Sequence, residues 1–345
     1  ACSVSLAMAT LLVFLPSLLS LPSVAPLVLA WADRRLPGDL EVESFSLGWR
    51  QGLRCENLHY HDPVLGLQLR LPALASDKGL LALLLAPSYL GEITIDQPTL
   101  VVLPPQVGPR SDRAVVSTRI GGNAAPWWER WTLRLKVNQG RVVDQGPDSG
   151  REIARDVDLS GSLAMGTVDY LLTFRAGQGQ GRLLAKGFVN LPAAGQPLPA
   201  SLISRSELEI RDLEIADFLA IAAARGNAPH CRGVLNAVCR LNASGVGEMA
   251  VEGDASLRDL QLAGSFLGPD QPSFPQVQFS FKGGRRGDEW QLSNLNLQAA
   301  LLRFAASGSL DRSAAKLSAK GSLDLPSLAA QLPHLLNLRQ QTAFK

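Results

Sequence analysis

The chain has 345 residues, of which 46% are hydrophobic, so it can bury a substantial interior and has the length of about two domains. Its 33 basic and 31 acidic residues are spread along the sequence and give a formal net charge of +2. Because no basic stripe is present, we expect no nucleic-acid partner. Aromatic residues make up only 6%, so the apolar surface is aliphatic and suits acyl chains better than bases or sugars.

The first 32 residues contain no charged side chain, and the run from Val4 to Leu21 is almost wholly apolar. About 20 such residues cross a bilayer as a helix. We therefore predict a membrane span over residues 3–22 and an interfacial continuation, which together make residues 1–32 a membrane anchor. The alternative is a cleaved secretory signal peptide. Both interpretations export the rest of the chain, although Arg34 and Arg35 directly after the span are typical of a cytoplasmic flank.

Beyond Pro37 the dominant pattern is apolar residues alternating with polar ones, which is typical of strands with one apolar face. The alternation is clear in WTLRLKV, VQFSF and LSNLNL, and the runs are bounded by Gly, Asn, Asp or Pro as in turns. Short links of this kind predict antiparallel neighbours. The sequence thus predicts a mainly β protein with an elongated, curved antiparallel sheet and a few short helices.

Three helices are expected: Gly79–Ala86, Ile215–Ala224 and Ser327–Leu338, the last opened by Pro326 as its first helical residue. The latter two each follow a strand with similar punctuation, about 110 positions apart, which indicates an internal repeat and a sheet that grows lengthwise. The stretch from Leu103 to Pro126 lacks periodicity and is rich in Pro, Gly and Ser. We expect a strand-rich unit over 33–103, a linker over 104–126 and a repeated strand-rich groove over 127–345. The chain starts at Ala1 and shows no closing element, so we expect a fragment that is truncated at the C-terminus.

Few residues have a spacing that indicates chemistry. His59 and His61 face the same side of a strand beside Asp62, which is compatible with a metal site but more typical of a solvated strand end. His230 and His334 are isolated in the sequence. Cys231 and Cys239 bracket a short segment and either form a disulfide or are two small buried side chains. No nucleophile, phosphate-loop or zinc motif is present, and we expect no enzyme activity, metal or cofactor.

Several segments carry recognisable motifs: the apolar N-terminus followed by GDLEVESFSLGWRQGLRC, then GLLALLL, GEITIDQPTL, the Asn-x-Gly-x-Val of VNQGRVV, and KGSLDLPSLAAQLPHLL. Together these segments resemble the AsmA-like family of bacterial envelope proteins, which includes the TamB type. The family resemblance implies an inner-membrane, single-pass protein with the bulk of its chain in the periplasm. It also implies a curved sheet whose apolar concave face holds or conducts phospholipid.

Independently of the family, an apolar sheet face without an opposing layer must close on itself, be covered, or line a groove. We therefore expect the chain to bind or transfer phospholipid through its acyl chains in cell-envelope biogenesis. The alternative is a structural assembly factor that contacts outer-membrane proteins without lipid transport. The candidate groove residues are Leu133, Leu135, Val137, Val277, Phe279, Phe281 and Leu292.

Overall fold

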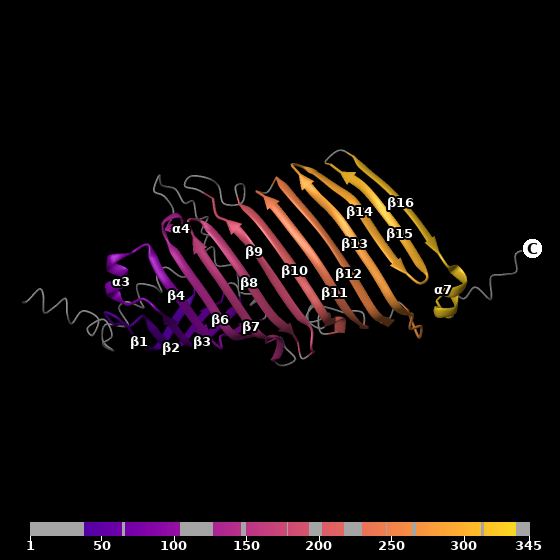
Figure 1. The fold of residues 1–345 in the computed structure, drawn as a ribbon. Coiled ribbons are helices and arrows are strands. Elements are labelled where there is room, and N and C mark those ends of the chain that lie inside the picture. Colours follow the sequence, from indigo (N-terminus) through magenta and orange to yellow (C-terminus); the bar gives the residue numbers. More distant parts are fainter. Residues whose placement is uncertain are drawn as a thin grey trace, which may run out of the picture. The chain divides into compact units, whose positions relative to one another are not determined.

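The computed structural model describes residues 38–63, 66–103, 127–145, 150–177, 179–192, 202–216, 230–245, 247–263, 267–311 and 314–335. The described part is mainly β, with 71% of its residues in strands, a long antiparallel sheet and few helices (Figure 1). The predicted class is confirmed at this level. The chain divides into two compact units that adjoin in sequence at Tyr170 and Leu171, within one strand.

Unit 1 holds the N-terminal strands in the order β1-β2-β3-β4-β6-β7. Strands β1, β2 and β3 pair antiparallel with their sequence neighbours, as short turns dictate. Strand β8 contains the division between the units. The strands are β1 (Asp39–Ser46), β2 (Arg54–Asp62), β3 (Leu67–Ser76), β4 (Tyr89–Asp96), β5 (Thr99–Val102), β6 (Thr132–Asp144), β7 (Arg151–Ala164) and β8 (Thr167–Ala176).

One pairing in unit 1 departs from the expected antiparallel meander. Strands β4 and β5 both pair antiparallel with β3 and both run parallel to β6. They therefore form one interrupted strand that lies between β3 and β6. A parallel neighbour needs a long crossover connection, and 29 residues separate Val102 from Thr132. The expected linker over 104–126 belongs to that connection and lies outside the described residues.

At the interruption this strand and β6 share a local change of backbone conformation, and the pairing register is the same on both sides of it. Gln97 and Gln139 both adopt left-handed backbone angles, with φ of 50° and 53°. The Gln97 amide donates to the Asn138 carbonyl at 2.8 Å, and the Arg141 amide donates to the Pro98 carbonyl at 2.8 Å. Pro98, which has no amide proton to donate, lies between the end of β4 and the start of β5, where no ladder hydrogen bond is required of it. The IDQP and VNQG motifs therefore form one structural feature although they lie about 40 residues apart.

Unit 2 is a meander in which consecutive strands from β9 to β16 pair antiparallel. The pairing is almost uninterrupted along β11, β12 and β13, the longest strands. The strands are β9 (Arg182–Asn190), β10 (Ile203–Glu214), β11 (His230–Ser244), β12 (Glu248–Ala263), β13 (Ser273–Arg286), β14 (Glu289–Ala299), β15 (Leu302–Leu310) and β16 (Ala315–Leu323).

The described helices are short: α3 (Leu80–Leu85), α4 (Trp127–Arg130) and α7 (Leu325–Gln331). Helix α3 confirms the prediction for 79–86. Helix α7 begins before the predicted start, because Asp324 is its N-cap and accepts hydrogen bonds from the Ser327 amide at 3.3 Å and hydroxyl at 2.6 Å. Pro326 is consequently the second helical residue, not the first. The helix ends at Gln331, ahead of Pro333, which cannot continue it.

Two predicted helical segments fall largely outside what the structure describes. Of the expected helix at 215–224, only Ile215 and Ala216 are described, and both are helical. The expected membrane span over 3–22 lies wholly outside the described residues. Within the described part of the chain, no helix combines the length and the apolar character that crossing a membrane requires.

Candidate functional site

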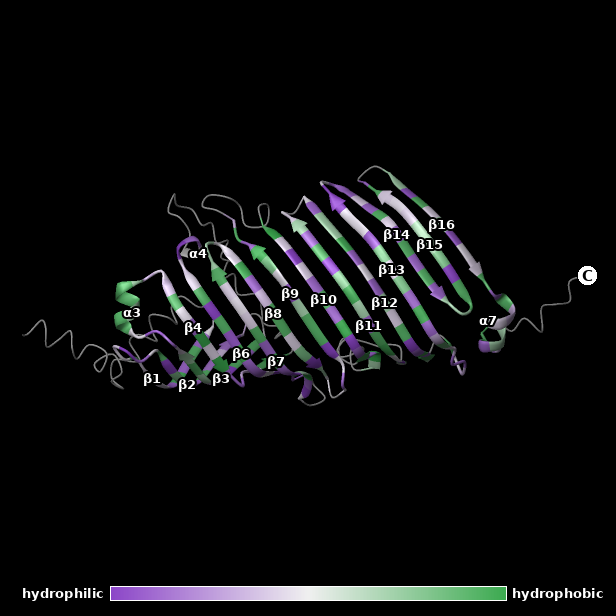
Figure 2. Ribbon diagram, in the orientation of Figure 1, coloured by the Kyte–Doolittle hydropathy of each residue, from purple (hydrophilic) through white to green (hydrophobic). Residues whose placement is uncertain are grey.

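The strands of unit 2 bring apolar side chains into continuous cross-strand rows. Residues paired directly across antiparallel strands point to the same face of a sheet. Figure 2 shows the resulting alternation of hydrophobic and hydrophilic residues along β9 to β15. One row, from β9 to β16, comprises Ala185, Leu208, Cys239, Gly253, Phe281, Leu295, Ala306 and Ala319. The adjacent row comprises Leu183, Ile210, Ala237, Ala255, Phe279, Leu297, Phe304 and Gly321.

Large side chains on this apolar face stay only partly covered. Phe279 and Phe281 lie side by side, with ring centroids 5.6 Å apart, yet both remain half-buried. Some positions of the face are buried, such as Val277 and Ala306. Toward β16 the exposure increases, and Leu317 is 73% exposed. The apolar face of unit 2 is thus formed by rows of aliphatic and aromatic side chains that the described residues do not cover completely.

A cavity of about 450 Å³ lies on this face across β12 to β16. Its volume is in the range of about 300–1,000 Å³ that ligand pockets occupy. Leu292, one of the predicted groove residues, and Phe281, another, belong to its wall. The remaining lining includes Met249, Val251, Trp290, Leu310 and Leu317.

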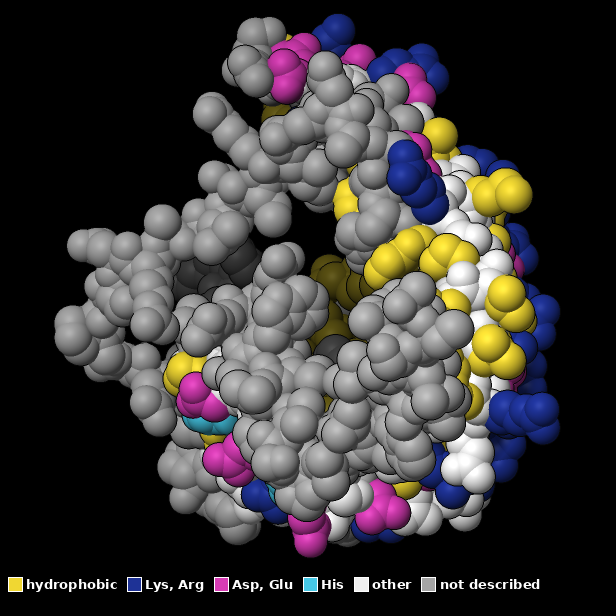
Figure 3. Space-filling view, turned by 90° about the vertical axis from the view of Figure 1, so that its left-hand side faces the viewer, with side chains coloured by type: hydrophobic (Ala, Val, Ile, Leu, Met, Phe, Trp, Pro, Cys, Tyr) yellow, Lys and Arg dark blue, Asp and Glu magenta, His cyan; other side chains and the backbone are white. Residues whose placement is uncertain are grey.

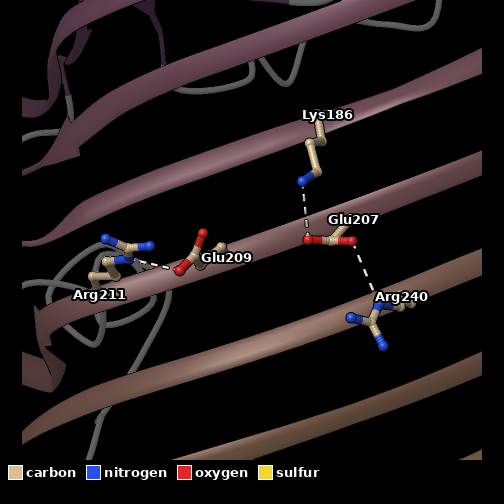
Figure 4. A network of polar contacts seen from close by, with 5 residues as sticks. All are labelled: Lys186, Glu207, Glu209, Arg211 and Arg240. Atoms are coloured by element: carbon tan, nitrogen blue, oxygen red, sulfur yellow. Dashed lines mark hydrogen bonds and ion pairs between the residues drawn. The ribbon is translucent and has the colours of Figure 1, made fainter.

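The opposite face of unit 2 carries a ladder of alternating charges. Lys186, Glu207, Arg240, Glu252 and Lys282 are successive cross-strand partners on β9 to β13. Their ion pairs span 3.2 Å, 3.4 Å, 3.8 Å and 3.2 Å, and Figure 4 shows the first two. Hydrogen bonding from Lys186 is the main cause that lowers the pKa of Glu207, and Arg240 contributes in the same direction.

A larger hollow, of about 660 Å³, lies against this polar face. Amide, hydroxyl and charged side chains line most of it, among them Asn236, Asp254 and Gln278. An acyl chain placed there would displace the water that hydrogen-bonds to these polar groups. It offers no hydrogen bonds in return, so its binding there is unfavourable. The smaller cavity on the apolar face therefore suits an apolar ligand better. Figure 3 shows Lys and Arg side chains along the right-hand edge of the view, with hydrophobic side chains next to them.

The predicted groove residues fall into two groups. Leu133, Leu135 and Val137 lie on β6 in unit 1, where Leu163, Gly161 and Leu159 of β7 are their partners. Val277, Phe279 and Phe281 lie on β13 in unit 2, and Leu292 of β14 lies opposite Gly283 on the same face. Each group shares the apolar face of its own unit.

Sequence reasoning missed the part of the cavity wall that β12 and β16 supply. Met249 and Val251 alternate in EMAVEG, and Leu317 lies in AKLSAKGSL. Both runs are rich in small and charged residues, which makes the alternation weak. The alternation of Met249 and Val251 was the one sequence signal that could have placed β12 in the cavity wall.

The structure also bears on the possible disulfide and on the possible metal site. Cys231 and Cys239 are free thiols. Both lie on the extended strand β11, where eight residues span about 26 Å, so they cannot form a disulfide with each other. The described residues contain no group of three or more His, Cys, Asp or Glu side chains that could hold a metal ion, and this includes His59, His61 and Asp62.

His334, isolated in the sequence, has a partner in the fold. Its Nδ1 lies 2.8 Å from Oδ1 of Asp270, in the turn before β13. The Asp270 carboxylate is 4% exposed and also accepts hydrogen bonds from the backbone amides of His334 and Leu335. Together with the Gln331 side chain, which accepts from the Ser273 amide at 3.0 Å, this contact fastens α7 to the start of β13.

Comparison with known proteins gives no relative for this chain. No family model matches it, and neither a curated protein nor a solved structure is detectably similar.

Proposed function

We propose that the chain is an AsmA-like envelope protein that binds phospholipid acyl chains on the apolar face of its sheet and carries out no catalysis. The observation that supports this most directly is the set of apolar rows in unit 2, with a cavity of about 450 Å³ among them. Covering such a surface with an acyl chain gains roughly 25 cal/mol for each Å² removed from water. In this proposal residues 3–22 anchor the chain in the bacterial inner membrane and the strands project into the periplasm.

The test is the amount of phospholipid that co-purifies with the full chain, measured by mass spectrometry per mole of protein. Val277→Glu with Phe279→Glu places two carboxylates on the apolar face of β13. We expect this double variant to lose most of the bound lipid, because an acyl chain cannot solvate a carboxylate.

The matched control is Gln276→Glu with Gln278→Glu, which adds the same charge to the same strand. Both glutamines are exposed, and they alternate with Val277 and Phe279. This control should retain lipid at the level of the unmodified protein. Equal lipid loss in both double variants, with circular dichroism unchanged, would contradict the proposal. Absence of lipid from the unmodified protein would also contradict it and leave the assembly role, with partner strands docking on the exposed strand β16, as the remaining proposal.

A further inference from the structure

At one end of the apolar face, a positive charge interrupts an otherwise apolar row. Arg285 of β13 pairs across the sheet with Met249 of β12 and Trp290 of β14, and Trp290 pairs with Leu310 of β15. Direct cross-strand partners share a face, so Arg285 lies on the apolar side. This end is the one where β13 finishes and β14 begins, at the top of the view in Figure 1.

The guanidinium of Arg285 is held in place by its neighbours. Its central carbon lies 5.5 Å from the centroid of the Trp290 ring, within the range of a cation–π contact. Its Nε donates to the Gly287 carbonyl at 2.7 Å. Asp288 places a carboxylate oxygen 3.9 Å from Nη2, and an ion pair of that length between side chains 34% and 54% exposed contributes little. The planar fork, which suits phosphate, is therefore oriented but only weakly neutralised.

The cavity of about 450 Å³ begins beside this arginine. Trp290 and Met249 belong both to the row of Arg285 and to the cavity wall. Beyond them, along β13 toward its start, lie Phe281, Phe279 and Val277. The eight steps along the strand from Arg285 to Val277 span about 27 Å at about 3.4 Å each. An acyl chain fills half of a hydrocarbon core about 30 Å thick, or about 15 Å, so one chain fits along this strip.

We propose that Arg285, stacked on Trp290, selects lipids whose headgroup carries a net negative charge and fixes their direction on the sheet. The headgroup lies at the β13–β14 turn, and the acyl chain runs along β13 toward α7. This inference rests on the proposed lipid binding and adds to it the headgroup class and the orientation.

The headgroup test uses the full chain and two lipids with identical acyl chains, phosphatidylglycerol and phosphatidylcholine, offered separately in vesicles. We expect the unmodified protein to take up the anionic lipid roughly tenfold more than the zwitterionic one, the ratio that corresponds to about 1.4 kcal/mol. Arg285→Gln should reduce the ratio to about one with little change in phosphatidylcholine uptake. Arg286→Gln is the matched control, because Arg286 is the next residue, points to the opposite face and has a side chain 90% exposed.

The outcomes separate the two proposals. A preference that survives Arg285→Gln, or that disappears equally in Arg286→Gln, overturns the inference and leaves lipid binding intact. Uptake of neither lipid by the unmodified protein overturns the proposed function and the inference together. A preference lost only in Arg285→Gln supports both.

The direction of the lipid is tested by fluorescence quenching. Trp290 emission is obtained as the difference between the unmodified protein and Trp290→Leu. A spin label on the headgroup should quench this emission more strongly than a label at the end of the acyl chain. Stronger quenching by the chain-end label would overturn the orientation.

Discussion

At the residue scale, Asp270 has the clearest consequence for stability. Desolvation raises its pKa, but hydrogen bonds from the Leu335 amide and from the ring and amide of His334 outweigh it, so the pKa is lowered from 3.8. A carboxyl group whose pKa falls on folding stabilises the protein above its unfolded pKa, and the contribution is lost as the pH falls through the folded value. The attachment of α7 is therefore fully present at neutral pH and weakens below about pH 4.

We expect Asp270→Asn to lose this attachment at neutral pH as well. The measurement is the protection of the His334 and Leu335 amides against hydrogen exchange, relative to the intrinsic rate at the same pH. This protection should fall in Asp270→Asn at pH 7 and in the unmodified protein only in acid. Asp254→Asn changes an exposed carboxylate on the polar side of β12 and serves as the control. Unchanged exchange in Asp270→Asn would show that α7 does not depend on this carboxylate.

Contacts of this kind could not be read from the sequence. Asp270 and His334 lie 64 positions apart, and no pattern in the sequence links the two residues. The left-handed residues Gln97 and Gln139 are a different case. Their IDQP and VNQG motifs were recognisable, but the sequence did not indicate that the two motifs adjoin. Local patterns predict local geometry, whereas the pairing of distant residues depends on the strand order.

At the scale of the element, the charge ladder on β9 to β13 contributes to strand register. The ion pairs are in contact with solvent, so each one alone contributes little to stability. A shift by one residue would move the ladder to the apolar face and the apolar rows to the polar face, so both patterns favour the same register.

Glu252→Lys tests the ladder, because it places a third cation between Arg240 and Lys282. Like charges directly opposite each other destabilise strand pairs, and we expect a loss of roughly 1 to 2 kcal/mol at low salt. The loss should shrink in about 1 M salt, where the Debye length is about 3 Å. Urea unfolding at both salt concentrations measures it. Glu252→Gln, which removes attraction without adding repulsion, should have a smaller effect, and an equal effect at both salt concentrations would contradict an electrostatic origin.

Strands with strict alternation, such as β6 and β13, were predictable from the sequence. The parallel pairing of β4 with β6 was not, because alternation determines which face a residue occupies and not which strand lies beside it. Of the residues that line the apolar cavity, the sequence predicted only Phe281 and Leu292 as groove residues. Much of the remaining wall comes from strands whose small residues weaken the alternation.

At the scale of the whole molecule, pairing between consecutive strands makes stability in unit 2 a local property. Leu213 of β10 is 2% exposed. It packs tightly against Gly181, because a Cβ atom added to Gly181 would lie only 2.8 Å from the Cα atom of Leu213. Leu213→Ala removes buried methyl groups and should cost about 2–5 kcal/mol. Because each strand contacts only its neighbours, the effect should decline along the sheet.

Hydrogen exchange measures that decline. In Leu213→Ala we expect protection to fall in β9, β10 and β11 and to remain close to normal in β15. Glu214→Ala, an exposed neighbour on the same strand, should change stability by no more than about 0.5 kcal/mol. A uniform loss of protection from β9 to β15 would show that unit 2 unfolds as a single cooperative body.

The uninterrupted antiparallel order of unit 2 also sets the smallest change by which such a protein can lengthen or shorten. Gain or loss of one strand would reverse the direction of every strand that follows. Gain or loss of a hairpin, such as β14 with β15, leaves β13 and β16 running in opposite directions and still able to pair. Duplication and deletion in steps of two strands therefore preserve both faces, and the length of the apolar strip can change while its chemistry stays the same.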